Sequence, residues 1–195
     1  MQTILAPPFA WRWNRVGASP TVPTFTTVAG QSDYSVSLPS FGWIEKATAY
    51  DLSNGNSAYE LQVYLNKSAD PLSNQPTSIS AQYDDDSGNI TFRVFPTPDA
   101  VYSVVVEYQK SAPQFSSLTQ TWSPLPDYMS YIFNEGYMAK AYDYFSDPRY
   151  MGSMQMFLTN LAAASENLNE TEKNIWLENR LNSMRQTAAV QSGRR

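Results

Sequence analysis

The chain has 195 residues, of which 42% are hydrophobic and 16% are charged, and its net charge at pH 7 is −5. It contains no cysteine and no histidine, which excludes disulfides, Cys–His pairs, a Ser–His–Asp triad and His-based zinc sites within one chain. The acidic balance argues against a general nucleic-acid binder, which has a basic surface. No apolar run reaches the length of about 18 residues that a membrane helix needs.

The low content of charged residues bears on the surface of the protein. Soluble domains typically contain about 25% charged residues, against 16% in this chain. Its surface must therefore be covered by uncharged polar side chains or by other protein chains. This composition is a first indication of assembly.

The first half of the chain has the residue pattern of β-strands. Polar and apolar residues alternate between Pro, Gly and Asn, which predicts strands at 33–38, 43–52, 57–65, 78–84, 89–96 and 100–110. Asn54-Gly55 predicts a tight hairpin turn, because both residues tolerate positive φ, and the sequence DDSG at 85–88 predicts a second one. We expect a small antiparallel β-sandwich or a barrel-like sheet.

The second half of the chain has helical spacing. Pro126 and Asp127 suit the first turn of a helix, and Pro148 ends that helix. A second helix carries apolar residues from Tyr150 onward, and a segment at about 170–186, opened by Asn169, is either a third helix or a continuation of the second.

The predicted fold class is α+β, with the β-rich part as an insertion and a C-terminal helical hairpin or bundle. The predicted domains are an N-terminal segment that packs on the helices, a β-rich domain, a helical part and a flexible tail, at residues 1–19, 20–112, 113–186 and 187–195 respectively.

Carboxylates are the remaining candidates for chemistry. Residues 84–86 are three successive aspartates that could bind calcium, but they lack the alternating ligand spacing of an EF-hand and fit a solvated turn better. Glu45, Glu60 and Glu107 could support glycoside hydrolysis, although each occupies a position where an outward polar residue is expected. We therefore predict a protein that is not an enzyme, with no catalytic residue, metal or cofactor.

The segment WRWNR at 11–15 combines aromatic and basic residues. Trp11 and Trp13 would lie on one side of a strand beside Arg12 and Arg15, an arrangement that could stack on single-stranded nucleic acid. In the alternative, the tryptophans pack the end of the β-rich part onto the helices. The acidic chain favours the second interpretation.

The helical hairpin from 125 to 150 carries more aromatic residues than one buried stripe needs. Tyrosine is favoured where a surface is buried against another protein while its hydroxyl stays hydrogen-bonded. We expect the hairpin to face both its own β-rich part and neighbouring subunits, through Tyr128, Tyr131, Tyr137, Tyr144 and Tyr150.

The order of these features resembles the head-to-tail adaptor proteins of tailed phages, also called gatekeeper or upper tail tubular proteins. The matching stretches are AGQSDYSVSLP at 29–39, VYSVVVEYQKSAP at 101–113, LPDYMSYIFNEGYMAKAYDYF at 125–145 with its Asp-Pro break, and MQMFLTNLAAASENL at 154–168. The resemblance covers most of residues 11–186 and rests on the pattern and order of these stretches.

The resemblance implies a structural virion protein at the head–tail junction, assembled in the host cytoplasm. It implies a ring of twelve copies beneath the portal protein, through which DNA passes without specific binding, and no contact with a membrane. The helices would form the ring, the β-rich part would contact a tail nozzle or tail tube protein, or tail fibres, and the C-terminal segment, with Gln191, Arg194 and Arg195, would dock on the portal.

One departure and two alternative functions remain open at this point. Many members begin with a long helix, whereas this sequence reaches Trp11 almost at once, so the bundle would be smaller or another chain would supply that helix. A β-sandwich carbohydrate- or protein-binding module of a tail or baseplate would place Trp43, Tyr59 or Tyr83 along a groove. A carboxylate hydrolase is the third possibility.

Overall fold

The computed structural model describes residues 1–17, 19, 21–65, 72–84, 88–114, 117 and 123–192. The chain divides into two compact units, a β-unit formed by residues 14–113 and a helical unit formed by residues 1–13 together with 114–195. The β-unit is therefore an insertion between two parts of the helical unit. The domain boundaries expected from the sequence are at 19 and 112, whereas residues 14–19 and residue 113 fall in the β-unit.

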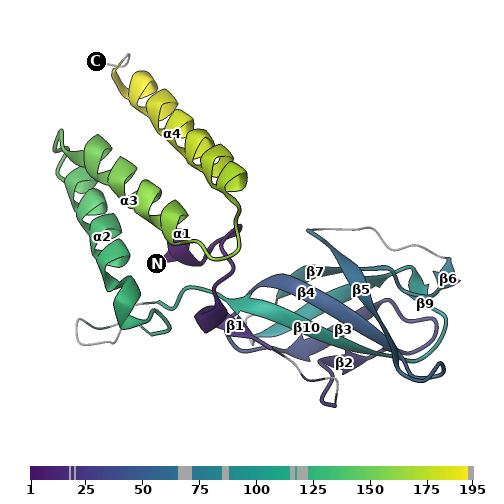
Figure 1. The fold of residues 1–195 in the computed structure, drawn as a ribbon. Coiled ribbons are helices and arrows are strands. Elements are labelled where there is room, and N and C mark those ends of the chain that lie inside the picture. The colour runs from purple at the N-terminus through teal and green to yellow at the C-terminus, as the bar shows by residue number, and fades with distance from the viewer. Residues whose placement is uncertain are drawn as a thin grey trace. The chain divides into compact units, whose positions relative to one another are not determined.

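The β-unit is built on one large mixed sheet (Figure 1). Its strands lie in the order β1-β10-β4-β5-β7-β8-β3, β2 pairs with the same edge of β10 as β1, and β6 and β9 form a separate short pair. The strand bounds are β1 Arg15–Val16, β2 Phe25–Thr26, β3 Asp33–Ser37, β4 Phe41–Asp51, β5 Ser57–Tyr64, β6 Ser73–Asn74, β7 Ser78–Asp84, β8 Asn89–Phe95, β9 Thr97–Pro98 and β10 Tyr102–Lys110.

The sheet curls into a half-barrel around its hydrophobic core. Phe25 of β2 stacks on Tyr34 of β3, with ring centroids 4.8 Å apart, although these strands lie near opposite ends of the sheet. In β8 the alternate residues Ile90, Phe92 and Val94 are buried, as expected for a strand with one face toward a core. The predicted α+β class, with a barrel-like sheet, is confirmed.

Two details of the sheet differ from a simple antiparallel pattern. Strands β5 and β7 pair in parallel, with Gln62 opposite Ser78. The turn after β4 is longer than a two-residue hairpin, because Asp51 pairs with Ser57 and both Gly55 and Asn56 have positive φ. Of the second predicted turn, residues 85–87 lie outside the described part of the chain.

The helical unit consists of a short N-terminal helix and three longer ones, with α3 between α2 and α4 (Figure 1). The bounds are α1 Gln2–Leu5, the 3₁₀ turns η1 Arg12–Asn14 and η2 Asp127–Met129, α2 Ser130–Tyr144, α3 Tyr150–Ala164 and α4 Glu170–Ser192. None of the helices in the described residues is long and apolar enough to cross a membrane.

The start of α4 is fixed by a reciprocal cap. The Asn169 side chain accepts from the Glu172 backbone N–H, and the Glu172 carboxylate accepts from the Asn169 N–H, both at 2.9 Å. Thus α4 is separate from α3, one of the two arrangements that the sequence left open.

Helix α4 continues to Ser192, so residues 187–192, which the sequence assigned to an aperiodic tail, have helical backbone. The segment contains two alanines and neither Pro nor Gly before position 193, a composition that allows a helix to continue without an apolar stripe.

Candidate interaction surfaces

Helix α2 packs on α3 through an inner face of small and aliphatic residues. Ile132 and Ala139 are fully buried, and the absence of a side chain at Gly136 lets the Phe157 ring of α3 come close. A Cβ at position 136 would lie 2.9 Å from a ring carbon. The Asn160 amide of α3 also donates to both carboxylate oxygens of Glu135 at 2.9 Å. These contacts fix the rotation of α2, so its opposite side points away from α3.

That opposite side, the outer α2 face, is both exposed and uncharged. Its members are Tyr131, Asn134, Tyr137, Met138, Ala141, Tyr144 and Phe145. The most exposed are Tyr144 at 84%, Phe145 at 77% and Tyr137 at 65%. A helix at the surface of a monomeric protein normally carries charges on its solvent side. The exposed charges of α2, Lys140 and Asp143, lie beside the outer α2 face, and none belongs to it.

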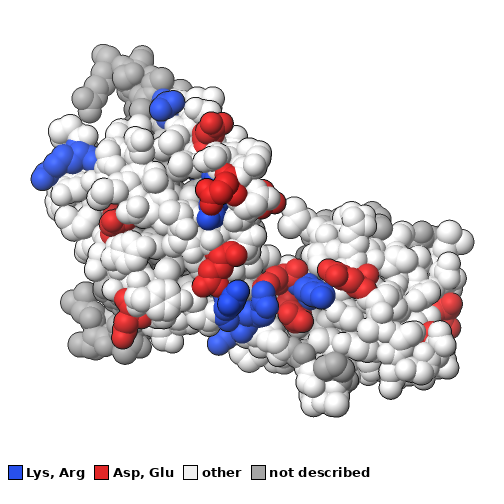
Figure 2. All heavy atoms as spheres, in the orientation of Figure 1, with Lys and Arg blue, Asp and Glu red and all other residues white. Residues whose placement is uncertain are grey.

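The charged residues of α2 lie outside its outer face. Glu135 is bound by Asn160, and Lys140 pairs with Asp143 at 3.3 Å along the helix. In the view of Figure 2, the surface over α2 and α3 carries only scattered acidic and basic side chains, with uncharged residues between them. A surface without charge can be covered by another protein without the cost of desolvating ions.

The five tyrosines predicted at an interface do not all share this face. Tyr131, Tyr137 and Tyr144 belong to it. Tyr128 is 63% exposed but lies in the preceding turn η2. Tyr150 is half-buried at the start of α3. The sequence analysis missed Met138 and Phe145. Tyr131, Met138 and Phe145 follow one another at intervals of seven residues, about two helical turns, and this spacing would have indicated them.

The predicted docking residues of the C-terminus are only partly described. The backbone of Gln191 lies in helix α4. Its side chain, and Arg194 and Arg195 altogether, lie outside the described residues.

The N-terminal tryptophans serve packing within the helical unit. Trp11 is 1% exposed, its indole N–H donates to the Ile4 carbonyl at 2.7 Å, and its ring stacks on Phe9 and Trp13. Phe9 in turn meets Trp176 of α4 edge to face at 4.8 Å. Trp11 is therefore unavailable for stacking on nucleic acid. Trp13 lies within the 3₁₀ turn η1 and Trp11 directly precedes it, so the two do not lie on one side of a strand.

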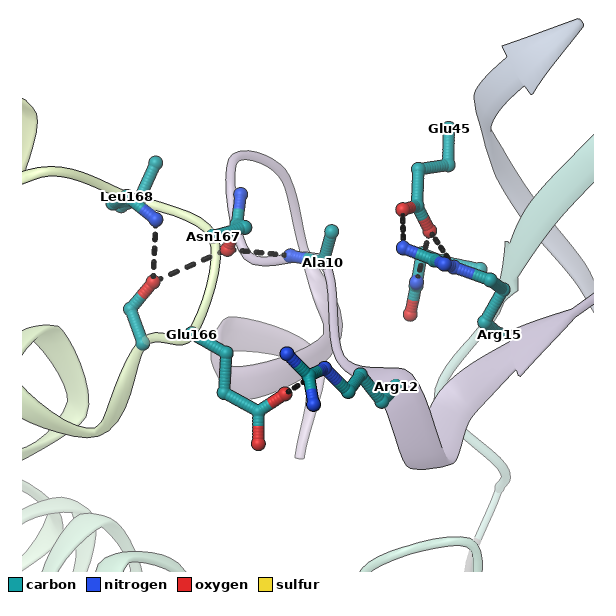
Figure 3. Close-up of polar contacts among 9 residues, drawn as sticks. Ala10, Arg12, Arg15, Glu45, Glu166, Asn167 and Leu168 are labelled. Carbon is teal, nitrogen blue, oxygen red and sulfur yellow. Dashed lines mark hydrogen bonds and ion pairs between the residues drawn. The ribbon is translucent and has the colours of Figure 1, made fainter.

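Polar contacts hold the same segment to the loop between α3 and α4 (Figure 3). The Asn167 side chain accepts from the Ala10 N–H at 3.0 Å and donates to the Pro8 carbonyl at 2.8 Å. Arg12 lies 3.4 Å from the Glu166 carboxylate. The N-terminal residues are thus an integral part of the helical unit.

The candidate carboxylates of the β-unit are engaged in sheet contacts. Glu45 accepts from the Arg15 guanidinium and, at 2.6 Å, from the buried amide of Gln109 (Figure 3). Glu60 faces Lys46 across the strands at 3.9 Å, and Glu107 is opposite the same lysine. The described residues hold no cluster of three or more potential metal ligands, and residues 85 and 86 and the Asp84 side chain lie outside the description.

The aromatic residues proposed for a sugar groove do not meet. Trp43 pairs with Gln109, whereas Tyr59 pairs with Ala49, six residues or about 20 Å further along β4. The Tyr59 ring also packs against Tyr102, and the Tyr83 side chain is outside the description. A groove of about 360 Å³ elsewhere in the β-unit is lined mainly by aliphatic residues, including Val16, Val36, Leu38 and Val106.

The comparisons with known proteins give one result. The model of the SU10 adaptor protein family matches residues 9–188, nearly the whole chain. No curated protein matches the sequence.

Proposed function

Because the chain belongs to the SU10 adaptor protein family, a structural family of phage head–tail adaptors, we propose that it assembles into a homo-oligomeric ring between the portal and the tail. The observation that carries this proposal is the outer α2 face. A structural virion component needs surfaces that bind other copies or other proteins, and this face has the residues that such contacts prefer.

The physical argument rests on what the outer α2 face would gain on burial. Fully burying a large apolar side chain contributes about 1.5–3 kcal/mol, and Tyr144 and Phe145 are 84% and 77% exposed in the free chain. Tyrosine and methionine are enriched at protein interfaces, and charged residues are depleted at their centres. The gain must still exceed the entropy lost on association, which several adjacent aromatic residues on each copy can supply.

The remaining parts of the chain receive roles by the resemblance to phage adaptors. Twelve copies would surround a DNA conduit, and the acidic chain, with net charge −5, would weaken binding to phosphate. The end of α4 and the residues after it, 187–195, would dock on the portal, and the β-unit would contact a tail nozzle or tail tube protein, with tail fibres as a further partner. The ring would form in the host cytoplasm and remain in the virion, at the head–tail junction.

The test of self-assembly is native mass spectrometry of the full chain over a concentration series, with negative-stain images of any large species. We expect one ring of uniform mass, whose copy number the mass gives. Tyr144→Asp places a charge on the outer α2 face and should abolish the ring. The matched control is Asn179→Asp, which adds the same charge to an exposed position of α4. A wild-type chain that stays monomeric at every concentration, or a Tyr144→Asp variant that assembles normally, would contradict the proposal.

Portal docking has a separate test. Deleting residues 187–195 removes only the last turns of α4, so the circular dichroism spectrum and the ring should survive. Cosedimentation of the truncated ring with portal particles should be lost. Undiminished binding by the truncated chain would contradict the role given to this segment.

A further inference from the structure

Helix α3 contains no charged residue in its 15 positions, YMGSMQMFLTNLAAA. One side of it is accounted for by the core, where Met154, Phe157, Leu158, Leu161 and Ala162 are buried. Its other side is exposed and is just as free of charge. This side, the outer α3 face, consists of Gly152, Met156, Thr159 and Ala163.

Helix α4 shows what a solvated helix of the same unit looks like. Its exposed residues include Glu178, Arg180 and Arg185. The absence of charge is therefore a property of the outer α2 face and of α3, and the general composition of the chain does not impose it on every helix.

We infer that the outer α3 face of one copy receives the outer α2 face of a neighbouring copy. The inference rests on the proposed self-assembly and goes further, because it names the two surfaces that meet. The side chains of the two surfaces differ in size, as they do where two helices interlock. The outer α2 face presents Tyr131, Met138 and Phe145, whereas the outer α3 face presents Gly152, Thr159 and Ala163 together with one methionine.

The open space at Gly152 supports this assignment. A Cβ at that position would meet nothing within 4 Å in the free chain. At this position the outer α3 face can thus receive a large side chain of another helix without displacing residues of its own copy. Close approach of two helices is favoured where one of them carries small residues, since the large residues of the other then fill the space between the axes.

The two faces also have compatible spacing. On α3 the residues follow one another at 152, 156, 159 and 163, and on α2 a stripe runs through 131, 134, 138, 141 and 145. Both are alternations of three and four residues, which keep a seam aligned between two helices that cross at about 20°.

A contact between two different faces is head-to-tail. Each copy offers its outer α2 face to one neighbour and its outer α3 face to the other, so the contact repeats until the rotation closes a ring. Pairing of α2 with α2 would instead give a two-fold dimer and leave α3 uncovered. The uncharged surface of α3 favours the head-to-tail arrangement.

Disulfide trapping can test this pairing directly, because the natural chain has no cysteine and a disulfide forms only when the two Cα atoms come within about 7 Å. Met138→Cys is combined with one cysteine at a time on the outer α3 face. A matched series combines it with one cysteine at a time on α4. The substituted positions are Gly152, Met156, Thr159 and Ala163 on α3, and Ile175, Asn179, Asn182 and Gln186 on α4. The assembled full-length protein is oxidised mildly and run on a non-reducing gel.

We expect ladders that extend beyond the dimer for at least one α3 position, and none for the α4 series or for Met138→Cys alone. A uniform ring that gives ladders only with α4, or with neither series, would overturn the inference and leave the proposed ring intact. Dimers from Met138→Cys alone would indicate two-fold pairing of α2 and would also overturn it. A chain that is monomeric by native mass spectrometry, and that gives no crosslink, would reject the proposed self-assembly itself.

A packing variant gives a second readout. Gly152→Leu should leave the free chain folded, because its side chain enters open space. It should raise the concentration needed for ring formation by about tenfold or more, since an oversized side chain forces a well-packed contact apart. Ring formation at the wild-type concentration, with the variant folded, would contradict the inference.

Discussion

The two glycines of the α2–α3 hairpin have opposite surroundings, and the same substitution should therefore have opposite effects. Gly136 of α2 faces the Phe157 ring, and an added Cβ would lie 2.9 Å from a ring carbon. Gly152 of α3 faces open space. Gly136 lies in the middle of α2 and Gly152 in the first turn of α3. Alanine is favoured over glycine by about 1 kcal/mol in a helix interior, which sets an upper value at Gly152.

The magnitudes follow from these surroundings. Gly152→Ala should raise the free energy of unfolding of the free chain by up to about 1 kcal/mol, or the melting temperature by up to about 4–8 °C for a unit of this size. At Gly136 the same gain is opposed by overpacking, because carbon atoms prefer separations of about 3.5–4.0 Å and Phe157 is only 5% exposed. With a cost of about 1–3 kcal/mol for overpacking, Gly136→Ala should range from neutral to about 2 kcal/mol destabilising.

Urea unfolding followed by far-UV circular dichroism measures both effects, at a protein concentration below that of any assembly. Phe157→Leu supplies the control. In a double-mutant cycle with Gly136→Ala it should show a coupling of about 0.5–3 kcal/mol, as expected for residues in contact. Equal stabilisation by Gly136→Ala and Gly152→Ala, or additivity with Phe157→Leu, would refute the close packing of α2 on α3.

Three further substitutions test other contacts by the same unfolding measurement. Asn169→Ala removes the cap of α4 and should destabilise the helical unit by about 1 kcal/mol, and an unchanged helical signal and midpoint would contradict it. Trp11→Phe leaves the buried Ile4 carbonyl without its 2.7 Å indole donor and should cost about 1–3 kcal/mol, whereas a neutral effect would show that this hydrogen bond is dispensable. The Arg93 guanidinium lowers the pKa of the partly exposed Asp33 from 3.8, so Asp33→Asn should cost up to about 1 kcal/mol at neutral pH. Because the folded-state pKa is depressed, this difference from wild type should be full above about pH 4 and shrink as the pH falls through that folded-state pKa; a difference that does not change with pH would contradict the ion pair.

The sequence predicted the positions of the individual strands well, but it did not predict the direction in which all of them pair. Alternation in segments such as 89–96 shows which residues face a core, and the structure buries Ile90, Phe92 and Val94 as expected. Alternation is the same for parallel and antiparallel partners, however. Strands β5 and β7 pair in parallel, and the alternation of residues within each strand does not indicate this direction.

The interaction surfaces were predicted in part for a similar reason. The excess of tyrosines in α2 indicated a second apolar side, and three of the five proposed residues lie on the outer α2 face. The outer α3 face was not predicted, because most of its residues are small and none of them individually indicates an interface. Its signal is an absence, the stretch without charge between Arg149 and Glu166, and this becomes informative only when the structure shows that the side is exposed.

The path of the chain into and out of the β-unit has a consequence for how such proteins can diversify. Arg15 pairs with Gln109, and the Asn14 side chain donates to the Lys110 carbonyl at 2.9 Å, so the entry and exit strands lie side by side. A short linker could therefore join the two parts of the helical unit in place of the β-unit. A different inserted domain could occupy the same place, while the packing of α2, α3 and α4 stays the same.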